Sequence, residues 1–242
     1  MKLIKLNATT STNDYLKQLI VQHAIEDFTV VWTEIQTQGK GQMGAKFVSE
    51  PLKNLTFSVY LGENPVEIKD LFSINCVVAN AVAEALECFN LTNIWIKWPN
   101  DILSYNKKIA GILIENSIKS NRDIQTIIGI GINILPTDFS EFPHASSVFQ
   151  QYGVEIDREK LLRKIVNILQ ERMTDVDKKS DTEWEKYHNR LFRKDVVSTF
   201  ETQEGICLPG VIKEVNREGQ LIVQHENDIV QHYNLKEIKL MY

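Results

Sequence analysis

Residues 96–115 read IKWPNDILSYNKKIAGILIE, and the polar groups of this stretch stand at the sharp points of a predicted strand, turn and hairpin. Pro99 ends one strand, and Asn100 and Asp101 occupy the turn that follows. Lys108 stands at the head of the next, apolar strand. A carboxylate and an ammonium group brought together by one hairpin form either a surface ion pair, worth about 0–1 kcal/mol, or an anchor for magnesium and phosphate.

Outward from this stretch, the chain alternates strand and helix signals. Between Asp70 and Phe89, apolar residues recur at three-and-four spacing, which is the clearest helical stripe in the sequence. Three more helices are expected, one starting near residue 12 behind the cap residue Ser11, one after Asp157 and a shorter one around 184–191. Strands rich in β-branched or aromatic residues are predicted at 3–6, 28–35, 55–61, 93–97, 109–115 and 124–134.

From about Asp195, the sequence changes to short alternating runs divided by turn residues, over 196–200, 211–215, 221–225 and 229–235. This pattern predicts a small β-barrel of roughly 50 residues attached to an α+β domain in which helices pack on a mixed sheet. We place the boundary between domains 1–190 and 191–242. No low-complexity linker separates them, so we expect the two to share an interface.

The composition is that of an ordinary globular protein, with 242 residues of which 43% are hydrophobic. The net charge of −5 argues against a broad electrostatic grip on nucleic acid. Because the N-terminus carries no long apolar run, neither a signal peptide nor a membrane span is expected, and a cytoplasmic location is predicted. Cys76, Cys88 and Cys207 are far apart, which argues against a disulfide framework or a thiolate metal site and predicts three buried apolar side chains.

A glycine-rich segment follows the strand predicted at 28–35, where residues 36–44 read QTQGKGQMG. Its G-x-G-x-x-G spacing is that of dinucleotide-binding loops, which require a helix to begin at the glycines. Residues 45–51 show no helical periodicity and include Pro51, so that interpretation fails, and the Lys-Ser or Lys-Thr of a Walker loop is missing. What remains is a strand-to-strand loop, either a plain hairpin loop or one whose backbone N–H groups and Lys40 fold over a bound anion.

Residues 128–134 read IGIGINI, a buried-strand pattern that carries two glycines and Asn133. Glycine weakens a strand unless another group must approach its backbone closely. A flat ring lying on this strand, with Asn133 at its edge, fits the pattern. A bulge or tight helix packing is the structural alternative.

Together these segments resemble one family, the biotin–protein ligases, also called biotin–[acetyl-CoA-carboxylase] ligases. The resemblance covers nearly the whole chain, and the Lys-Trp-Pro-Asn-Asp run is highly specific. It rests on Ser11-Thr12-Asn13, Gln36-Thr37-x-Gly39-x-Gly41-x-x-Gly44, Lys97-Trp98-Pro99-Asn100-Asp101, Lys108-x-Ala110-Gly111-Ile112-Leu113-x-Glu115 and Gly129-x-Gly131-x-Asn133. It implies a catalytic domain of the class II aminoacyl-tRNA synthetase and biotin ligase type, followed by an SH3-like domain.

Enzymes of this family activate biotin with ATP as biotinyl-5′-AMP and pass it to one lysine of a biotin carboxyl carrier domain. The resemblance thus implies ATP and Mg²⁺ as cofactors, biotin as substrate and that carrier as partner. It gives Lys108 an electrostatic role between carboxylate and phosphate, Asp101 a part in holding magnesium through ATP, and Lys97 the role of a second cation. The implied biotin-binding positions are Ser11, Thr12, Asn13, Gln36, Lys40, Gly41, Gln42, Lys108 and Gly111. The implied nucleotide-binding positions are Phe47, Asn100, Gly129, Gly131, Ile132 and Asn133.

Two departures from the family pattern shape further expectations. Bacterial members typically carry arginines and then a tryptophan in the glycine loop, where this chain has Lys40, Gln42, Ala45 and Phe47. With fewer cations we expect faster leakage of biotinyl-5′-AMP than from arginine-rich relatives, and equal release rates measured side by side without carrier would contradict this. The chain also opens directly on the catalytic domain, so a DNA-binding winged helix, and with it nucleic-acid binding, is not expected.

Two alternative functions stay open at this point. A lipoate or octanoate ligase or transferase shares the expected fold, although its usual arginine-rich and glycine-triplet signatures are missing here. A non-catalytic biotin or nucleotide sensor would bind without releasing pyrophosphate. A homodimer is also left open.

Overall fold

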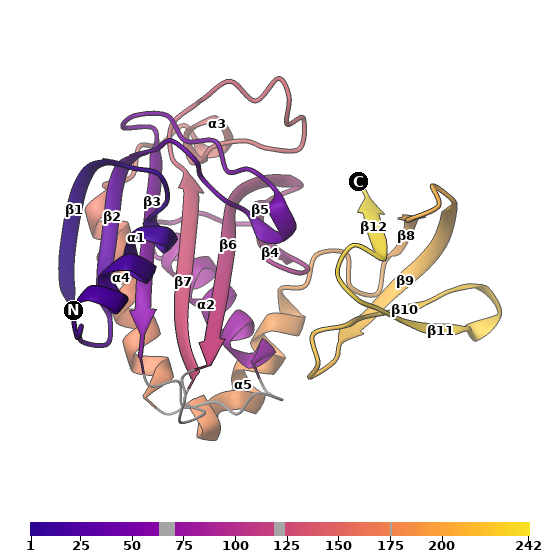
Figure 1. Ribbon diagram of the computed structural model, residues 1–242. Helices are drawn as coiled ribbons and strands as arrows, with labels where there is room; N and C mark the ends of the chain where they lie inside the picture. Colours follow the sequence, from indigo (N-terminus) through magenta and orange to yellow (C-terminus); the bar gives the residue numbers. More distant parts are fainter. Residues whose placement is uncertain (63–70, 119–123, 175) are drawn as a thin grey trace.

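Seven strands form the larger of two β-sheets in the computed structural model, which describes residues 1–62, 71–118, 124–174 and 176–242 (Figure 1). They are β1 (Lys2–Thr9), β2 (Thr29–Gln36), β3 (Asn54–Leu61), β4 (Ile94–Lys97), β5 (Asp101–Ser104), β6 (Lys107–Ile118) and β7 (Ile124–Asn133). The sheet runs in the order β1-β2-β3-β7-β6-β5-β4; β1 and β2 are parallel and the other neighbours antiparallel. The predicted α+β class with a mixed sheet is confirmed.

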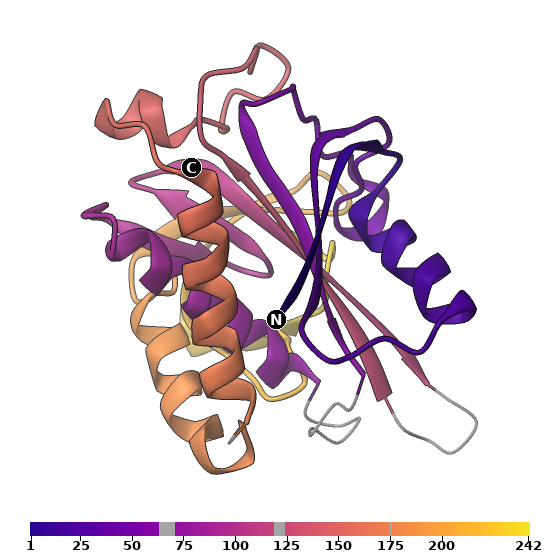
Figure 2. The same cartoon turned by 90° about the vertical axis from the view of Figure 1, so that its left-hand side faces the viewer.

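Helices cover both faces of this sheet, because both faces carry apolar side chains. They are α1 (Thr12–Gln22), α2 (Phe72–Glu87), α3 (Val148–Tyr152), α4 (Arg158–Met173) and α5 (Val176–Asn189). α2 and α4 pack on one face with α5 beside them, and α1 lies on the other (Figure 2). The main core fills the first face, and a smaller cluster that includes Leu16 and Tyr60 lies under α1. None of the described helices is long and apolar enough to cross a lipid bilayer.

A second, antiparallel sheet follows the last helix. Its strands are β8 (Val197–Thr202), β9 (Cys207–Val215), β10 (Leu221–Gln224), β11 (Val230–Tyr233) and β12 (Ile238–Met241), in the order β11-β10-β9-β8-β12. The Trp98 indole N–H donates to the Gly219 carbonyl at 2.9 Å, so the two sheets share an interface as expected. The predicted boundary after residue 190 falls between α5 and β8, and the division into two domains stays a prediction.

Several local predictions need correction. The helix predicted around 184–191 is α5, which begins earlier, at Val176. Asp101, predicted to lie in a turn, is the first residue of β5. β5, α3 and β12 are too short, at four or five residues, to show a period in the sequence. The predicted helix start at Asp70 lies outside the described residues.

The cysteines follow the expectation only in part. Cys76 is a buried free thiol on α2, as predicted. Cys88 caps the end of α2 and Cys207 begins β9, and both are exposed because each lies where its element meets a turn. The prediction that all three are buried is therefore wrong for these two residues.

Candidate active site

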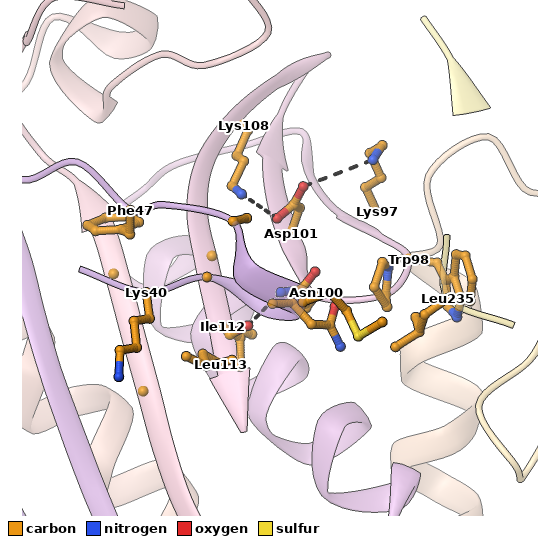
Figure 3. Close-up of a pocket in the computed structure, with 18 of the residues that line it drawn as sticks. Lys40, Phe47, Lys97, Trp98, Asn100, Asp101, Lys108, Ile112, Leu113 and Leu235 are labelled. Carbon is orange, nitrogen blue, oxygen red and sulfur yellow. Dashed lines mark hydrogen bonds and ion pairs between the residues drawn. The ribbon is translucent and has the colours of Figure 1, made fainter. Parts of the chain in front are cut away.

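A cavity of about 450 Å³ opens beside the larger sheet and is closed on one side by the second sheet (Figure 3). Its lining comes from the β2–β3 loop, the β4–β5 turn, β6 and β7, with further residues from the second sheet. The lining includes these predicted site residues: Ser11, Thr12, Asn13, Gln36, Lys40, Gly41, Gln42, Phe47, Lys97, Asn100, Asp101, Lys108, Gly111, Gly129 and Gly131. Segments far apart in the sequence thus meet at one place.

Lys108 and Asp101 form the closest ion pair in the cavity, with 2.6 Å between Lys108 Nζ and Asp101 Oδ1. The pairing of β5 with β6 shifts at Ile102 and Leu103, so that Leu103 faces Lys108 and Ile109 is passed over. Such a bulge re-aims side chains, and here it brings Lys108 to the side of the sheet on which Asp101 lies. Figure 3 shows the two groups pointing toward each other.

The backbone of Lys108 is held by a segment that follows β7. The Lys108 N–H donates to the His144 carbonyl at 2.7 Å, and the Ser146 N–H donates to the Lys108 carbonyl at 2.9 Å. Asn100 acts similarly on the turn before β5, because its side-chain amide donates to the Ile112 carbonyl at 2.6 Å. These bonds fix the end of the cavity that holds Lys108 and Asp101, which is called the reacting end in the proposals below.

Lys97 approaches the same carboxylate from β4, with 4.0 Å between its Nζ and Asp101 Oδ2. The Lys97 side chain is only 20% exposed. Burial lowers the pKa of Lys97 below the ordinary value of a lysine, Lys108 and Lys239 lower it further, and Asp101 opposes the change. Two ammonium groups therefore meet at one carboxylate.

Another end of the cavity is lined by the uncharged polar side chains of Thr12 and Gln36. The backbone N–H and the hydroxyl of Thr12 both donate to the side-chain oxygen of Gln36, at 2.8 and 3.0 Å. The Ser58 hydroxyl lies 2.6 Å from the Thr12 hydroxyl and 2.5 Å from the Asn13 side-chain oxygen. The Asn13 amide also donates to Glu115 at 2.8 Å. This network orients Thr12 and Gln36, while the polar atoms of Asn13 are taken up within the protein.

The glycine loop is a strand-to-strand loop, as predicted, and it folds as a small hairpin. Lys40 and Lys46 form an isolated β-bridge, and the Phe47 N–H donates to the Gly39 carbonyl at 3.0 Å. The Lys40 ammonium group binds Asp14 of α1 at 2.6 Å and points away from Lys108 in Figure 3. On the other side of the cavity, the Lys236 ammonium group donates to the Met43 carbonyl at 2.9 Å. The loop is thus tied to α1 and to the second sheet.

The two glycines of β7 leave room for other side chains. A Cβ atom at Gly131 would lie 2.5 Å from Phe47 Cζ, so the Phe47 ring lies directly on this strand. A Cβ atom at Gly129 would lie 2.5 Å from the Asn13 side-chain oxygen. In this structure the Phe47 ring thus lies where the sequence pattern left room for a flat ring, and the predicted ligand ring on this strand stays a prediction.

Two predicted nucleotide-binding residues do not line the cavity. Ile132 is fully buried in the core. Asn133 is 7% exposed; its amide donates to the Ser146 carbonyl at 3.0 Å and its oxygen accepts from Asn54 at 2.9 Å. The Asn133 side chain is used to hold the 144–146 segment, and the predicted adenine contact of these residues stays a prediction.

Charge is distributed unevenly around the cavity. Among the described residues, its lining contains one carboxylate, Asp101, and six lysines: Lys40, Lys46, Lys97, Lys108, Lys236 and Lys239. The chain as a whole carries a net charge of −5. A concentration of positive charge inside a net-negative protein favours an anionic ligand.

The described side chains do not form a metal-binding cluster of their own. In the described part of the chain, no three His, Cys, Asp or Glu side chains gather as a metal site. Asp101 Oδ1 is bound to Lys108, which leaves Oδ2 beside Lys97. Magnesium is usually held by one or two carboxylates together with substrate phosphates. Asp101 is the one carboxylate in the described lining that could join phosphate oxygens in holding such an ion, and its part in binding magnesium stays a prediction.

Sequence patterns missed two groups of residues here. Ser58 supports the polar end, and the alternation of Thr56 and Ser58 with the buried Leu55 and Phe57 is the signal that indicates it. The second-sheet residues Leu235, Lys236, Ile238, Lys239 and Leu240 also line the cavity. No local pattern indicates these, because only the packing of the two sheets brings them there.

Comparison with known proteins gives consistent results. A family model described as the biotin/lipoate A/B protein ligase family matches residues 6–133. The chain is 31% identical over 160 residues to the bifunctional ligase/repressor BirA of Salmonella typhimurium, covering 64% of this chain and 48% of that protein. It is 32% identical over 135 residues to the biotin–[acetyl-CoA-carboxylase] ligase of Paracoccus denitrificans, covering 52% and 55%. The matches thus span about half the length of these curated relatives.

Among solved structures, the chain is similar to the biotin protein ligase from Aquifex aeolicus in complex with biotin and ATP. The TM-score is 0.81 at 24% sequence identity, over 99% of this chain and 98% of that one. Likeness at this level of identity shows a shared fold across both sheets.

Proposed function

The chain belongs to the biotin/lipoate A/B protein ligase family, and on that premise we propose that it activates biotin with ATP as biotinyl-5′-AMP and transfers biotin to a lysine of a biotin carboxyl carrier domain. The observation that carries the proposal is the pair of lysines, Lys97 and Lys108, that meet at the Asp101 carboxylate in the cavity. Family membership narrows the chemistry to acyl activation and transfer, and the charge of the cavity is what this chemistry demands.

The first step brings two anions together. A carboxylate oxygen of biotin attacks the α-phosphorus of ATP, the bond from that phosphorus to the bridging oxygen breaks, and pyrophosphate leaves. Two unit charges about 4 Å apart repel by roughly 4 kcal/mol at an effective dielectric constant near 20. Lys108, held by Asp101 at 2.6 Å, supplies a fixed positive charge that lowers this barrier as the transition state forms. Lys97 adds a second positive charge from β4.

Asp101 is the carboxylate that would hold a magnesium ion arriving with ATP, and such an ion would neutralise charge on the departing pyrophosphate. The protein's own contribution is the position of Asp101, which is fixed by its bond to Lys108 and by the start of β5.

The uncharged end of the cavity suits the ureido ring of biotin. Thr12 donates two hydrogen bonds to the Gln36 side-chain oxygen. The amide nitrogen of Gln36 is therefore the group that can donate to a ligand. Ile112 and Leu113 of β6 supply apolar lining between this end and Lys108. A few donors and acceptors at one end of an apolar slot are typical of sites for small molecules.

The biotinyl-5′-AMP formed in the first step must be protected from water until the carrier arrives. The neutral amine of the carrier lysine attacks the acyl carbon, the bond from that carbon to the phosphate oxygen breaks, and AMP leaves with its electron pair. The attacking nitrogen gives up one proton to the surrounding water as the amide forms. The mixed anhydride hydrolyses in water, so a covering loop is required. The glycine loop, tied to Asp14 by Lys40 and to Lys236 through Met43, supports that role.

One experiment tests the function directly. The protein is incubated with ATP, magnesium, labelled biotin and a carboxylase carrier domain, and both pyrophosphate and the label on the carrier lysine are measured. We expect both products. Labelling by lipoate or octanoate in place of biotin would identify the alternative ligase or transferase, and biotin binding without pyrophosphate would identify a sensor.

A further inference from the structure

One aromatic side chain reaches from the second sheet to the reacting end of the cavity. Tyr242 follows β12, on the side of the second sheet that faces the larger sheet (Figure 1). Its ring packs against His144 and Phe192, with ring centroids 4.7 and 5.3 Å apart. His144 belongs to the segment that holds the Lys108 backbone. Tyr242 is therefore fixed next to the catalytic lysines without lining the cavity itself.

The Tyr242 ring also contacts an ammonium group. Lys97 Nζ lies 5.5 Å from the ring centroid, within the range of about 6 Å over which cations are attracted to aromatic faces. The other neighbours of Lys97 are Asp101 at 4.0 Å, Lys108 and Lys239. Asp101 is already bound to Lys108 at 2.6 Å. Lys97 thus shares the Asp101 carboxylate with Lys108, which lies closer to it, and it is also repelled by the positive charges of Lys108 and Lys239.

A lysine side chain has several rotatable bonds, and like charges nearby favour conformations that carry its ammonium group away. The ring of Tyr242 offers a partly desolvated attraction that opposes this movement. Resting on the proposed function, we propose that Tyr242 is a positioning residue whose ring keeps the Lys97 ammonium group directed at Asp101 and the reacting phosphate. The second sheet then contributes to catalysis through one side chain that does not touch substrate.

The functional test uses Tyr242→Leu, Tyr242→Phe and Tyr233→Leu, each assayed for pyrophosphate release. Tyr242→Leu removes the ring and should lower kcat for adenylation about tenfold, with little change in KM for biotin. Tyr242→Phe keeps an aromatic face and should retain most of the activity. Tyr233→Leu alters another tyrosine of the same sheet and controls for general destabilisation.

A double-mutant cycle separates positioning from general support. In a Lys97→Met background the ammonium group is gone, so Tyr242→Leu should cause no further loss. Full activity of Tyr242→Leu would overturn the proposal. An equal loss from Tyr242→Leu in the presence and absence of the Lys97 ammonium group would overturn it as well, because the ring would then act on something else.

A spectroscopic measurement tests the contact independently of activity. Methylene protons of Lys97 held over an aromatic face should resonate upfield of those of exposed lysines, with the signals assigned through Lys97→Arg. The shift should persist in Tyr242→Phe and vanish in Tyr242→Leu, and an unshifted Lys97 in the unmodified protein would overturn the inference. If the protein formed no adenylate at all, the proposed function would fail, and the methylene shift would still decide whether Tyr242 holds Lys97.

Discussion

At the scale of single residues, Lys108 and Lys97 share the Asp101 carboxylate unequally. Lys108 makes the short bond, and Lys97 stays 4.0 Å away in a more buried position. The two lysines therefore differ in burial and in their distance from the carboxylate, although both line one cavity. Their removal should affect the reaction differently.

Lys108→Ala should lower the rate of adenylate formation about 100-fold or more, by analogy with the removal of one preorganised charge donor. The measurement is pyrophosphate release at saturating biotin and ATP. Lys107→Ala is the matched control, because Lys107 binds the Pro143 carbonyl outside the cavity lining. Near-normal pyrophosphate release from Lys108→Ala would remove this residue from its proposed role.

The pKa of Lys97 predicts a dependence on pH. Because burial lowers this pKa, Lys97 loses its proton at a lower pH than an exposed lysine does. On the alkaline side, adenylation should therefore begin to decline at a lower pH than it would if this charge were carried by an exposed lysine. Lys97→Arg keeps a guanidinium group charged and should move the decline to higher pH. An unchanged alkaline limb in this variant would show that another group controls it.

At the scale of elements, the glycine loop is tied to the rest of the protein at two places, in addition to the hydrogen bonds within its own hairpin. Lys40 binds α1, and Lys236 binds the Met43 carbonyl from the second sheet. Neither partner is near the loop in sequence. Retention of the activated intermediate should thus depend on a residue almost two hundred positions away from the loop.

Lys236→Met should increase the rate at which biotinyl-5′-AMP escapes, by several-fold, because about 0.5–1.5 kcal/mol of hydrogen bonding to the loop is lost. The rate is measured by trapping released adenylate in the absence of carrier. Lys213→Met is the control, since Lys213 pairs with Asp195 at 2.9 Å and does not line the cavity. Equal escape rates in the two variants would show that the hydrogen bond from Lys236 to the Met43 carbonyl does not help to retain the adenylate.

At the scale of the whole molecule, the two sheets are joined by polar contacts as well as by a continuous apolar core. The core cluster includes Phe57 of β3 and Val223 of β10. Trp98, from the most specific sequence motif, donates its indole N–H to Gly219 at 2.9 Å. This residue therefore serves the interface as well as the cavity wall.

Trp98→Phe should lower the free energy of unfolding by about 1 kcal/mol or more, because the Gly219 carbonyl loses its partner and part of a buried ring is removed. Thermal or urea unfolding measures the change. Trp95→Phe makes the same exchange at a partly exposed position of β4 and should have a smaller effect. Equal effects of the two substitutions would show that the interface bond contributes nothing measurable.

The periodicity of 158–173 and the Ser11 cap predict helices correctly, because these signals are local and repeat over several turns. The motif spacing likewise predicts that Lys108 and Asp101 meet, since one hairpin joins them. Short elements such as β12 carry too few residues for such a signal. The hydrogen bond from the Asn133 amide to the Ser146 carbonyl joins the strand to a separate loop, so the pattern of the strand alone cannot indicate it.

The sequence by itself determined most of the helices and strands, the glycine loop between two strands and the lysine–carboxylate hairpin, because each of these depends on side chains close together along the chain. The mixed sheet also needs pairings between distant strands, such as β3 with β7. Only the tertiary structure decided that Phe47 lies on Gly131, that Lys236 holds the loop and that Tyr242 faces Lys97. Those contacts join residues dozens to nearly two hundred positions apart, and they exist only after the burial of apolar surface has packed the second sheet against the first.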